Sequence, residues 1–187
     1  MFTKPVILSV GRLAPVKAFD RIVRIHARLL SQGVENHLVI LGEGIERQKL
    51  EQEINRLGVS TSTFLTGHVQ NVLPWLKQAA VLALCSIYEG FPLAVLEAMH
   101  AGLPVVSMDC PSGPRELLDD GRAGILTPNG DEEAFLSALA KILSRPDLRE
   151  HYAEQGRIRA AQYTPERIVP RWESLFEKVI SSHARRN

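Results

Sequence analysis

Residues 81–101 read VLALCSIYEGFPLAVLEAMHA. The run from Val81 to Cys85 is apolar and has the length of a buried strand, whereas the residues from Pro92 to Ala101 are expected to form a helix. Proline suits the first turn of a helix, because the N–H group that it lacks would have no intrahelical partner there. A strand, a loop and a helix in this order form one unit of a parallel sheet that is covered by helices.

The same alternation extends outward over most of the chain. Six strands are expected, at Val6 to Val10, His37 to Leu41, Thr63 to Thr66, Val81 to Cys85, Val105 to Met108 and Gly124 to Leu126. Helices are expected at Val16 to Leu30, Ile45 to Leu57, Val72 to Ala79, Pro92 to Ala101 and Asp131 to Leu143. The pattern predicts the α/β class: a Rossmann-like domain with a six-stranded parallel sheet and helices on both faces. In such folds the loops at the carboxyl ends of the strands gather at one rim, where ligands bind.

The composition is that of one globular domain. With 187 residues, 45% of them apolar and 23% charged, the chain is long enough for one buried core and short for two domains. We expect a single domain over residues 1–187, with a core at about 5–145 and C-terminal helices at about 146–182. The net charge of +1 gives no reason to expect nucleic acid as a partner.

Nothing in the sequence predicts a transmembrane segment or an export signal. The longest apolar stretch, Ala79 to Cys85, is far shorter than the roughly 20 residues that cross a bilayer, and the N-terminus lacks a signal-peptide pattern. We therefore expect a cytoplasmic protein. Cys85 and Cys110 are too few for a disulfide framework or a zinc site, and both are expected to be reduced thiols with a packing role.

Beyond Leu143 the strand pattern stops, and two more helices are expected at Asp147 to Ala161 and Pro165 to Ile180. The second of these helices carries an apolar stripe, formed by Ile168, Trp172, Leu175, Phe176 and Val179. A stripe of this width needs a surface to cover. It either covers the edge of the domain's own sheet or reaches toward a second domain.

Two glutamates near the centre of the sequence are the strongest candidates for function. Glu89 lies in the loop at the expected ligand-binding rim, beside Gly90, whose lack of a side chain lets a ligand approach the backbone closely. Glu97 follows on the helix, near Leu93 and Leu96, which are expected to face the sheet. Because an unpaired buried carboxylate would be costly, sugar or ribose hydroxyls are candidate donors to Glu97. The competing interpretation is that Glu89 caps the helix and Glu97 faces solvent.

A second loop at the same rim carries two cations. It reads GRLAPVK at residues 11–17, directly after the first strand. Arg12 can hold a diphosphate through two hydrogen bonds, and Lys17 adds a compact positive charge. The free N–H groups at the start of the helix after Pro92 also favour anions. Either cation alone would mean little, but the two loops together favour a ligand that carries phosphate and hydroxyl groups.

Several motifs that would indicate other chemistry are absent from the sequence. There is no Asp-x-Asp element after a strand, no His-x-x-x-His and no Cys-x-x-Cys, so no metal site is expected. Gly42-Glu43-Gly44 begins like a dinucleotide fingerprint, but Arg47 replaces the third glycine. We interpret this segment as a tight turn that can contact a ligand. The sequence also lacks the motifs of a serine hydrolase and of a P-loop NTPase.

These features together resemble a known family, the C-terminal domain of family 4 glycosyltransferases with the GT-B fold. The resemblance runs from about Pro5 to Ile180. It rests on GRL…K at residues 11–17, LGEG at 41–44, GHV at 67–69, the Glu89 to Glu97 element, AGLPVV at 101–106 and GIL at 124–126. The chain would then be one half of a GT-B fold, the half that binds a nucleotide-sugar donor.

The resemblance implies roles for several rim residues in binding the nucleotide. Arg12 and Lys17 would hold the diphosphate, Val69 would lie against the nucleobase, and Glu97 would accept hydrogen bonds from the ribose hydroxyls. His68 either lines the same base pocket or makes a turn contact. The remaining expected donor-binding residues are two glycines of the rim loops, Gly11 and Gly44.

The sugar and the reaction are implied in the same way. Glu89 is the implied catalytic residue, and it would orient the transferred sugar together with backbone groups of Gly90, Phe91 and Leu93. Enzymes of this kind retain anomeric configuration without a metal or another cofactor, and a UDP-sugar is the expected donor. The expected acceptor is a glycan or a lipid-linked glycan, as in the synthesis of lipopolysaccharide and other surface polysaccharides. The full enzyme could then associate peripherally with the inner face of a membrane.

Three departures from the family pattern stand out. Ala18 replaces the glycine that often follows the family's lysine, and Pro92 stands where many members have glycine. The loop of residues 109–116 is a variant of the usual one, and Arg115 and Glu116 either reach the donor or have no part in the site.

Because the first strand begins almost at Met1, we expect the acceptor-binding domain that normally precedes this one to be absent from the chain. We expect the chain alone to be inactive, as an excised domain, a truncated product or half of a split enzyme. Two alternative functions stay open: another GT-B-type enzyme, such as a sugar-nucleotide epimerase or a sugar phosphorylase, or a non-catalytic nucleotide-binding module.

Overall fold

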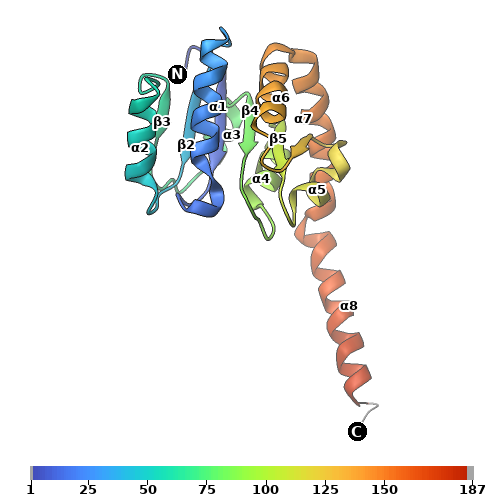
Figure 1. Ribbon diagram of the computed structural model, residues 1–187. Helices are drawn as coiled ribbons and strands as arrows, with labels where there is room; N and C mark the ends of the chain where they lie inside the picture. The colour runs from blue at the N-terminus through green and yellow to red at the C-terminus, as the bar shows by residue number, and fades with distance from the viewer. Residues whose placement is uncertain (1, 185–187) are drawn as a thin grey trace.

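Six parallel strands form the centre of the computed structural model, which describes residues 2–184 and the side chains of residues 2–181. The strands are β1 Val6–Val10, β2 His37–Leu41, β3 Thr63–Leu65, β4 Val81–Leu84, β5 Val105–Asp109 and β6 Ile125–Pro128. They are hydrogen-bonded in the order β3-β2-β1-β4-β5-β6 (Figure 1). The order reverses between β1 and β4, and in such sheets this switch point is where ligands bind, outside the carboxyl ends of the strands.

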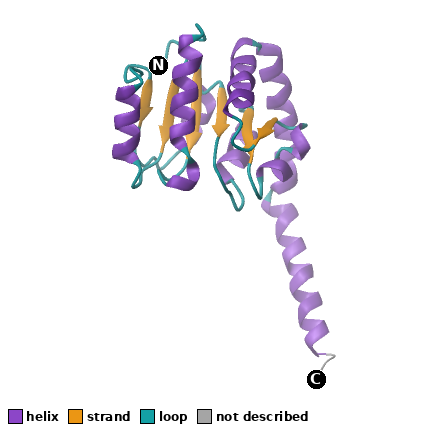
Figure 2. Cartoon of the chain, viewed as in Figure 1, coloured by secondary structure: helices purple, strands orange, loops and turns teal. Residues whose placement is uncertain are grey.

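Helices cover both faces of the sheet (Figure 2). One face is covered by α1 Phe19–Ser31, α2 Arg47–Arg56 and α6 Glu132–Ser144. The other face is covered by α3 Leu73–Gln78, α4 Leu93–Ala101 and the short α5 Pro114–Leu117. Helix α7, Pro146–Ala160, lies against both α4 and α6. The fold class predicted from the sequence is therefore confirmed.

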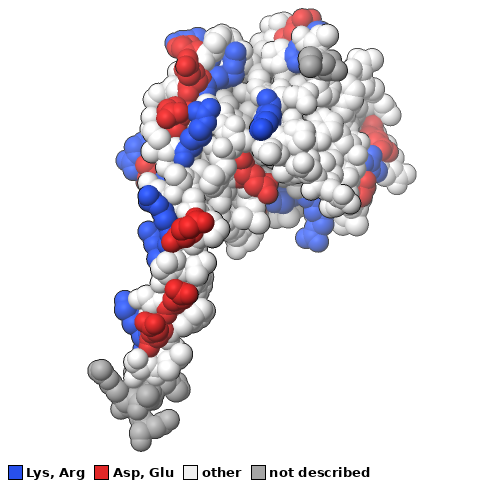
Figure 3. Space-filling model, turned by 180° about the vertical axis from the view of Figure 1, so that it is seen from behind, with Lys and Arg blue, Asp and Glu red and all other residues white. Residues whose placement is uncertain are grey.

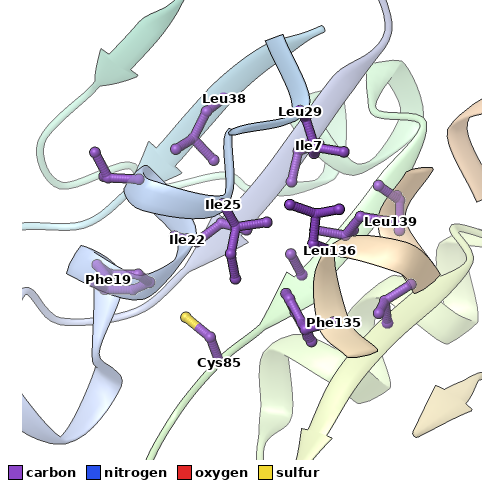
Figure 4. Close-up of a cluster of buried hydrophobic side chains, with 14 of the residues drawn as sticks. Ile7, Phe19, Ile22, Ile25, Leu29, Leu38, Cys85, Phe135, Leu136 and Leu139 are labelled. Atoms are coloured by element: carbon purple, nitrogen blue, oxygen red, sulfur yellow. The ribbon is translucent and has the colours of Figure 1, made fainter. Parts of the chain in front are cut away.

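Side chains of each strand alternate between two apolar clusters, one on each face. In β1, Ile7 packs into the cluster beneath α1 and α6, whereas Val6 and Leu8 pack into the cluster beneath α3 and α4. Figure 4 shows the first cluster, in which side chains of α1 and α6 meet over the sheet. Both faces of the central strands are buried, which is why these strands are continuous apolar runs rather than alternating ones.

The chain between β1 and α1 departs from the expected helix at Val16 to Leu30. A short 3-10 helix, η1 Pro15–Lys17, comes first, and α1 begins only at Phe19. Between them Ala18 has φ 48° and ψ 43°, the left-handed conformation that alanine rarely adopts. This residue turns the chain between the two helices, so the expected single helix is wrong over its first three residues.

Two further differences concern the loop of residues 109–116 and the C-terminus. The loop contains the start of α5 and leads into a second 3-10 helix, η2 Asp119–Gly121. A third, η3 Ala161–Tyr163, joins α7 to α8, Pro165–Ala184. Neither α5 nor η2 was expected, because segments of three or four residues have no measurable period in a sequence.

Helix α8 extends away from the rest of the molecule (Figure 1). Its apolar side chains are exposed, including Trp172 at 55% and Phe176 at 57%, and these two rings contact each other with centroids 5.8 Å apart. The interpretation that this stripe covers the domain's own sheet edge is therefore wrong. Figure 3 shows charged side chains of both signs along α8. Within residues 2–184, no helix is both long and apolar enough to cross a membrane.

Candidate functional site

An ion pair joins the two rim loops that the sequence singled out. Lys17 ends η1, in the loop after β1, and Glu89 lies in the loop after β4, the strand that pairs with β1. Lys17 Nζ donates to both carboxylate oxygens of Glu89, at 2.7 Å to Oε1 and 2.9 Å to Oε2. Glu89 is only 7% exposed. The switch point thus brings together a cation and a carboxylate that lie 72 positions apart in the sequence.

Three further contacts fix the Glu89 loop. The Ile87 N–H donates to the carbonyl of Val16 at 2.8 Å, and the Glu89 N–H donates to the carbonyl of Pro111 at 3.3 Å. The side chain of Asn129 donates to the carbonyl of Ile87 at 3.4 Å. The loop that carries Glu89 is therefore held by the loops that follow β1, β5 and β6.

A serine that the sequence analysis did not consider also contacts Glu89. Ser86 Oγ donates to Glu89 Oε1 at 2.6 Å, and Ser86 is 1% exposed. The only signal in the sequence is a serine three positions before the glutamate at the end of a strand. Side chains of serine often bond to nearby backbone groups, so that spacing alone does not predict this contact.

Glycines let the loops after β1, β2 and β3 interlock. The Gly11 N–H donates to the carbonyl of Leu41, and the Gly42 N–H donates to the carbonyl of Gly67, both at 2.9 Å. A Cβ atom added to Gly42 would overlap the carbonyl oxygen of Gly11, and one added to Gly44 would overlap that of Leu13. The tight turn expected at residues 42–44 is present. Gly44 is explained by this close packing, while its expected contact with a ligand stays a prediction.

A hollow of about 400 Å³, here called the β1–β2 hollow, opens at this edge of the sheet. Its walls include Gly11, Arg12, His68, Val69 and Val72. The side chain of Arg12 is exposed, and it donates no hydrogen bond and forms no ion pair within the part of the chain that the structure describes. Arg12 and Val69, expected to bind diphosphate and nucleobase, thus line one hollow, with His68 in its wall.

A second hollow of about 670 Å³, here called the α3–α4 hollow, adjoins the first through the shared residue Val72. Glu97 and Leu93 line it. Glu97 is exposed, and no partner for its carboxylate lies among residues 2–184. The expectation that Leu93 faces the sheet is wrong, because its side chain is 63% exposed and other residues of α4, such as Val95, take the buried positions.

Gly90 and Phe91 lie between the ion pair and α4. Gly90 is exposed, and a Cβ atom added to it would meet nothing within 4 Å. Phe91 is 42% exposed, and its ring centroid is 5.8 Å from that of Tyr163. The chain itself therefore does not need a glycine at position 90, and space remains there for a ligand to approach the backbone.

The loop of residues 109–116 borders a third hollow, of about 820 Å³, on the other side of the Glu89 loop. Arg115 pairs there with Asp109 and, at 3.3 Å, with Asp120, and Glu116 lines the same wall. A Cβ atom on Gly113 would meet the carbonyl oxygen of Gly90 at 3.2 Å, so the two loops touch. Arg115 and Glu116 are thus next to the Glu89 loop but line neither of the hollows that hold Arg12 and Glu97.

The chain matches a known family along most of its length. Residues 2–159 match the family described as Glycosyl transferases group 1. The chain belongs to the group 1 glycosyl transferases. It is 31% identical over 204 residues to an uncharacterized glycosyltransferase of Methanocaldococcus jannaschii, and the match covers 94% of this chain and 50% of that protein.

Two further matches to this glycosyl transferase chain come from bacteria. One relative, from Campylobacter jejuni, is an N-acetylgalactosaminyltransferase acting on N-acetylgalactosamine-N,N'-diacetylbacillosaminyl-diphospho-undecaprenol. It is 32% identical to this chain over 163 residues, and the match covers 87% of this chain and 44% of the relative. The crystal structure of a mutant of S. aureus TarM with fondaparinux, alpha-GlcNAc-glycerol and UDP superimposes with a TM-score of 0.88 at 23% identity, covering 93% of this chain and 36% of TarM. The chain therefore spans half or less of the length of these proteins.

Two thiols of this glycosyl transferase lie near the rim loops: Cys85 Sγ donates to the carbonyl of Ala18 at 3.3 Å, and Cys110 lines the third hollow. Cys85 and Cys110 are both free and buried. Burial raises the pKa of Cys85 to about 12 and that of Cys110 to about 11, so both stay protonated near neutral pH. Within residues 2–184 there is also no group of three or more His, Cys, Asp or Glu side chains that could hold a metal ion.

Proposed function

We propose that the chain is the donor-binding, C-terminal half of a retaining family 4 glycosyltransferase that uses a UDP-sugar and needs no metal or cofactor. The observation that carries this proposal is the position of the Lys17–Glu89 pair, at the switch point of the sheet and beside two adjoining hollows. The M. jannaschii relative supports the reaction class, since it is named as a glycosyltransferase. The UDP in the TarM structure is consistent with the choice of nucleotide.

The nucleotide is proposed to lie across the two hollows. The nucleobase would occupy the β1–β2 hollow against Val69, and the ribose hydroxyls would donate to Glu97 across Val72. The proposal for the ribose matches the state of Glu97, because this residue has no partner among residues 2–184 and an exposed carboxylate readily accepts hydrogen bonds from hydroxyls.

The diphosphate is proposed to lie between the loop after β1 and the start of α4. Arg12 can donate two parallel hydrogen bonds to phosphate oxygens, and the free N–H groups at the N-terminus of α4 add a partial positive charge. Lys17 Nζ has three protons and directs two hydrogen bonds to Glu89, so one remains for a phosphate oxygen. These groups would stabilise the leaving UDP without a metal ion.

The transferred sugar is proposed to lie over Gly90, where the chain leaves open space. Glu89 would be the catalytic residue that contacts the sugar, and the backbone of Phe91 and Leu93 would accept or donate further hydrogen bonds. The buried position of Glu89 matters here, because a carboxylate held in one orientation discriminates among sugar hydroxyls.

Transfer is proposed to need the part of the relatives' length that this chain does not span. That part would bind the acceptor, which we propose to be a glycan or a lipid-linked glycan, as the name of the C. jejuni relative states for that protein. The chain alone would then bind the donor in the cytoplasm, at the inner face of the membrane where a lipid-linked acceptor is used, and transfer no sugar.

Isothermal titration with UDP tests the nucleotide site. We expect wild-type protein to bind UDP, and Arg12→Ala and Glu97→Ala each to weaken binding by about tenfold or more, since each removes hydrogen bonds with a charged partner. Two exposed residues on other surfaces provide matched controls, Arg122→Ala and Glu173→Ala. Equal UDP affinity for Arg12→Ala, Glu97→Ala and the two controls would show that the site assignment is wrong.

A further inference from the structure

The carboxylate of Glu89 is held by side chains of two different loops. Its Oε1 atom accepts from Lys17 Nζ at 2.7 Å and from Ser86 Oγ at 2.6 Å. Its Oε2 atom accepts from Lys17 at 2.9 Å, and no second donor to Oε2 lies among residues 2–184. One oxygen therefore has two partners, and the other keeps an acceptor position free.

This arrangement fixes the rotation of the carboxylate. An ion pair with a lysine alone leaves the carboxylate free to turn, because an ammonium group is a compact charge on a flexible stem. A hydroxyl donor that is itself buried, as Ser86 is at 1% exposure, removes that freedom. Because Ser86 and Glu89 are three positions apart in the same loop, the Ser86 hydroxyl reaches one carboxylate oxygen of Glu89, Oε1.

Two buried serines within the strands behave differently from Ser86. Ser9 and Ser107 are both 0% exposed, and each donates at 2.8 Å to a backbone carbonyl, Ser9 to Ala83 and Ser107 to Met108. Within the described part of the chain, Ser86 is the serine whose hydroxyl donates to a carboxylate. Its hydroxyl is therefore directed to a candidate functional group rather than to the sheet.

We propose that Ser86 is a positioning residue for the transferred sugar. It holds Glu89 Oε1, so that Oε2 is presented to a sugar hydroxyl, and it acts only through Glu89. This inference rests on the proposed function in one respect, namely that Glu89 contacts the sugar of the donor. It assigns to Ser86 an effect on the sugar and none on the nucleotide.

Paired titrations with UDP and with UDP-sugars test this assignment. The probes are UDP, UDP-glucose, UDP-galactose and their N-acetylated forms, and the measured quantity is the Kd of the best UDP-sugar divided by the Kd of UDP. For Ser86→Ala we expect this ratio to rise about tenfold, because a carboxylate that is no longer held in place loses its hydrogen bond to the sugar hydroxyl. The Kd of UDP should change less than about twofold. Ser86→Thr keeps the hydroxyl and should restore the wild-type ratio.

Ser9→Ala is the matched control, since it removes an equally buried hydroxyl and leaves Glu89 untouched. It should keep the wild-type ratio even if it lowers stability. An unchanged ratio in Ser86→Ala, or an equal rise in Ser9→Ala, would overturn the proposal. If Ser86→Ala does not fold, Ser86→Cys takes its place, because a thiol is a weaker donor and should give an intermediate rise.

A second measurement needs no ligand. The side-chain carboxyl carbon of Glu89 is followed by NMR in protein labelled with ¹³C at glutamate, and its resonance is assigned by its loss in Glu89→Gln. We expect this resonance to move in Ser86→Ala and to stay in place in Ser9→Ala. If wild-type protein binds neither UDP nor any UDP-sugar, the proposed function fails, and this resonance still decides whether Ser86 holds Glu89. A resonance unchanged in Ser86→Ala would overturn that hold.

Discussion

Glu89 and Glu97 lie eight positions apart, yet the protein surrounds them in opposite ways. Glu89 is 7% exposed and accepts hydrogen bonds from Lys17 and Ser86, whereas Glu97 is exposed and has no partner within residues 2–184. An ionised carboxylate inside a protein needs donors from the chain itself, because burying it unpaired is costly. A carboxylate at the surface is solvated by water and can accept hydrogen bonds from a ligand.

The same contrast runs through the rest of the site. Lys17 is paired while Arg12 is open, and Gly42 is packed against backbone while Gly90 faces free space. Positions that the chain satisfies itself should determine stability. Positions that it leaves open should affect ligand binding and change stability little.

The largest effect is expected for Gly42→Ala. The new Cβ would overlap the carbonyl oxygen of Gly11, a backbone atom that cannot move without shifting the loop, so the free energy of unfolding should fall by about 3 kcal/mol or more. Gly90→Ala should change it by less than about 0.5 kcal/mol, because its Cβ meets nothing. Urea denaturation measures both. Similar losses for the two variants would contradict the contrast between packed and open glycines.

Lys17→Ala should have the next largest effect. It leaves the buried Glu89 carboxylate with Ser86 as its remaining side-chain partner, and we expect a loss of about 2 kcal/mol in the free energy of unfolding. This is less than for a fully buried pair, because the Lys17 side chain keeps 23% exposure. Arg12→Ala, at an open cation, should lose less than about 0.5 kcal/mol. Equal stability of the two variants in urea would show that the pair does not stabilise the fold.

His26 should make the stability depend on pH. It is fully buried on α1 and bonded to Asn36 at 2.7 Å and Ser62 at 2.9 Å, and burial lowers its pKa below the usual 6.5. Below pH 6.5 the imidazole takes up a proton in the unfolded chain but stays neutral in the folded chain. The free energy of unfolding therefore decreases as the pH is lowered, by up to about 1.4 kcal/mol per pH unit. His26→Gln should flatten this dependence between pH 6.5 and 5. The matched control is His68→Gln, at an exposed position, and an equal slope in wild type and His26→Gln would contradict the account.

The smallest effect is expected for Ala18→Gly. Glycine adopts the left-handed conformation of this residue without strain, which more than offsets its greater freedom in the unfolded chain, so the free energy of unfolding should rise by about 0.5 kcal/mol. Ala140→Gly, within helix α6, should instead lower it by about 1 kcal/mol. Thermal unfolding of the two variants measures the difference. A loss in both would mean that Ala18 is not strained.

Much of the sheet and the convergence of Lys17 with Glu89 could be predicted from the sequence. The strands are continuous apolar runs because both faces of the sheet are buried, and β1 and β2 begin and end where expected. The proximity of the two loops follows from the topology, since the loops after β1 and β4 must lie side by side if those parallel strands pair. The proximity of the two side chains follows from fold-level rules and needs no knowledge of the loops.

The finer arrangement could not be predicted. The division of Arg12 and Glu97 between two hollows depends on loop conformations that no periodicity reports. The left-handed Ala18 opposes the ordinary preference of alanine, so the expected helix began too early. Leu93 was expected at the sheet because it is apolar, but α4 turns other residues inward and leaves it at the rim. Apolarity alone does not tell a buried residue from one at an open site.

The most direct test of the account is an NMR titration that follows backbone amides, first with UDP and then with a UDP-sugar. UDP should shift the amides of residues 11–12, 68–72, 93, 96 and 97, which line the two hollows. The UDP-sugar should add shifts at residues 86–91, around Glu89 and Gly90. Shifts confined to the hollow beside residues 109–120, or no shifts at all, would contradict the claim that the open side chains of this sheet edge await a nucleotide-sugar.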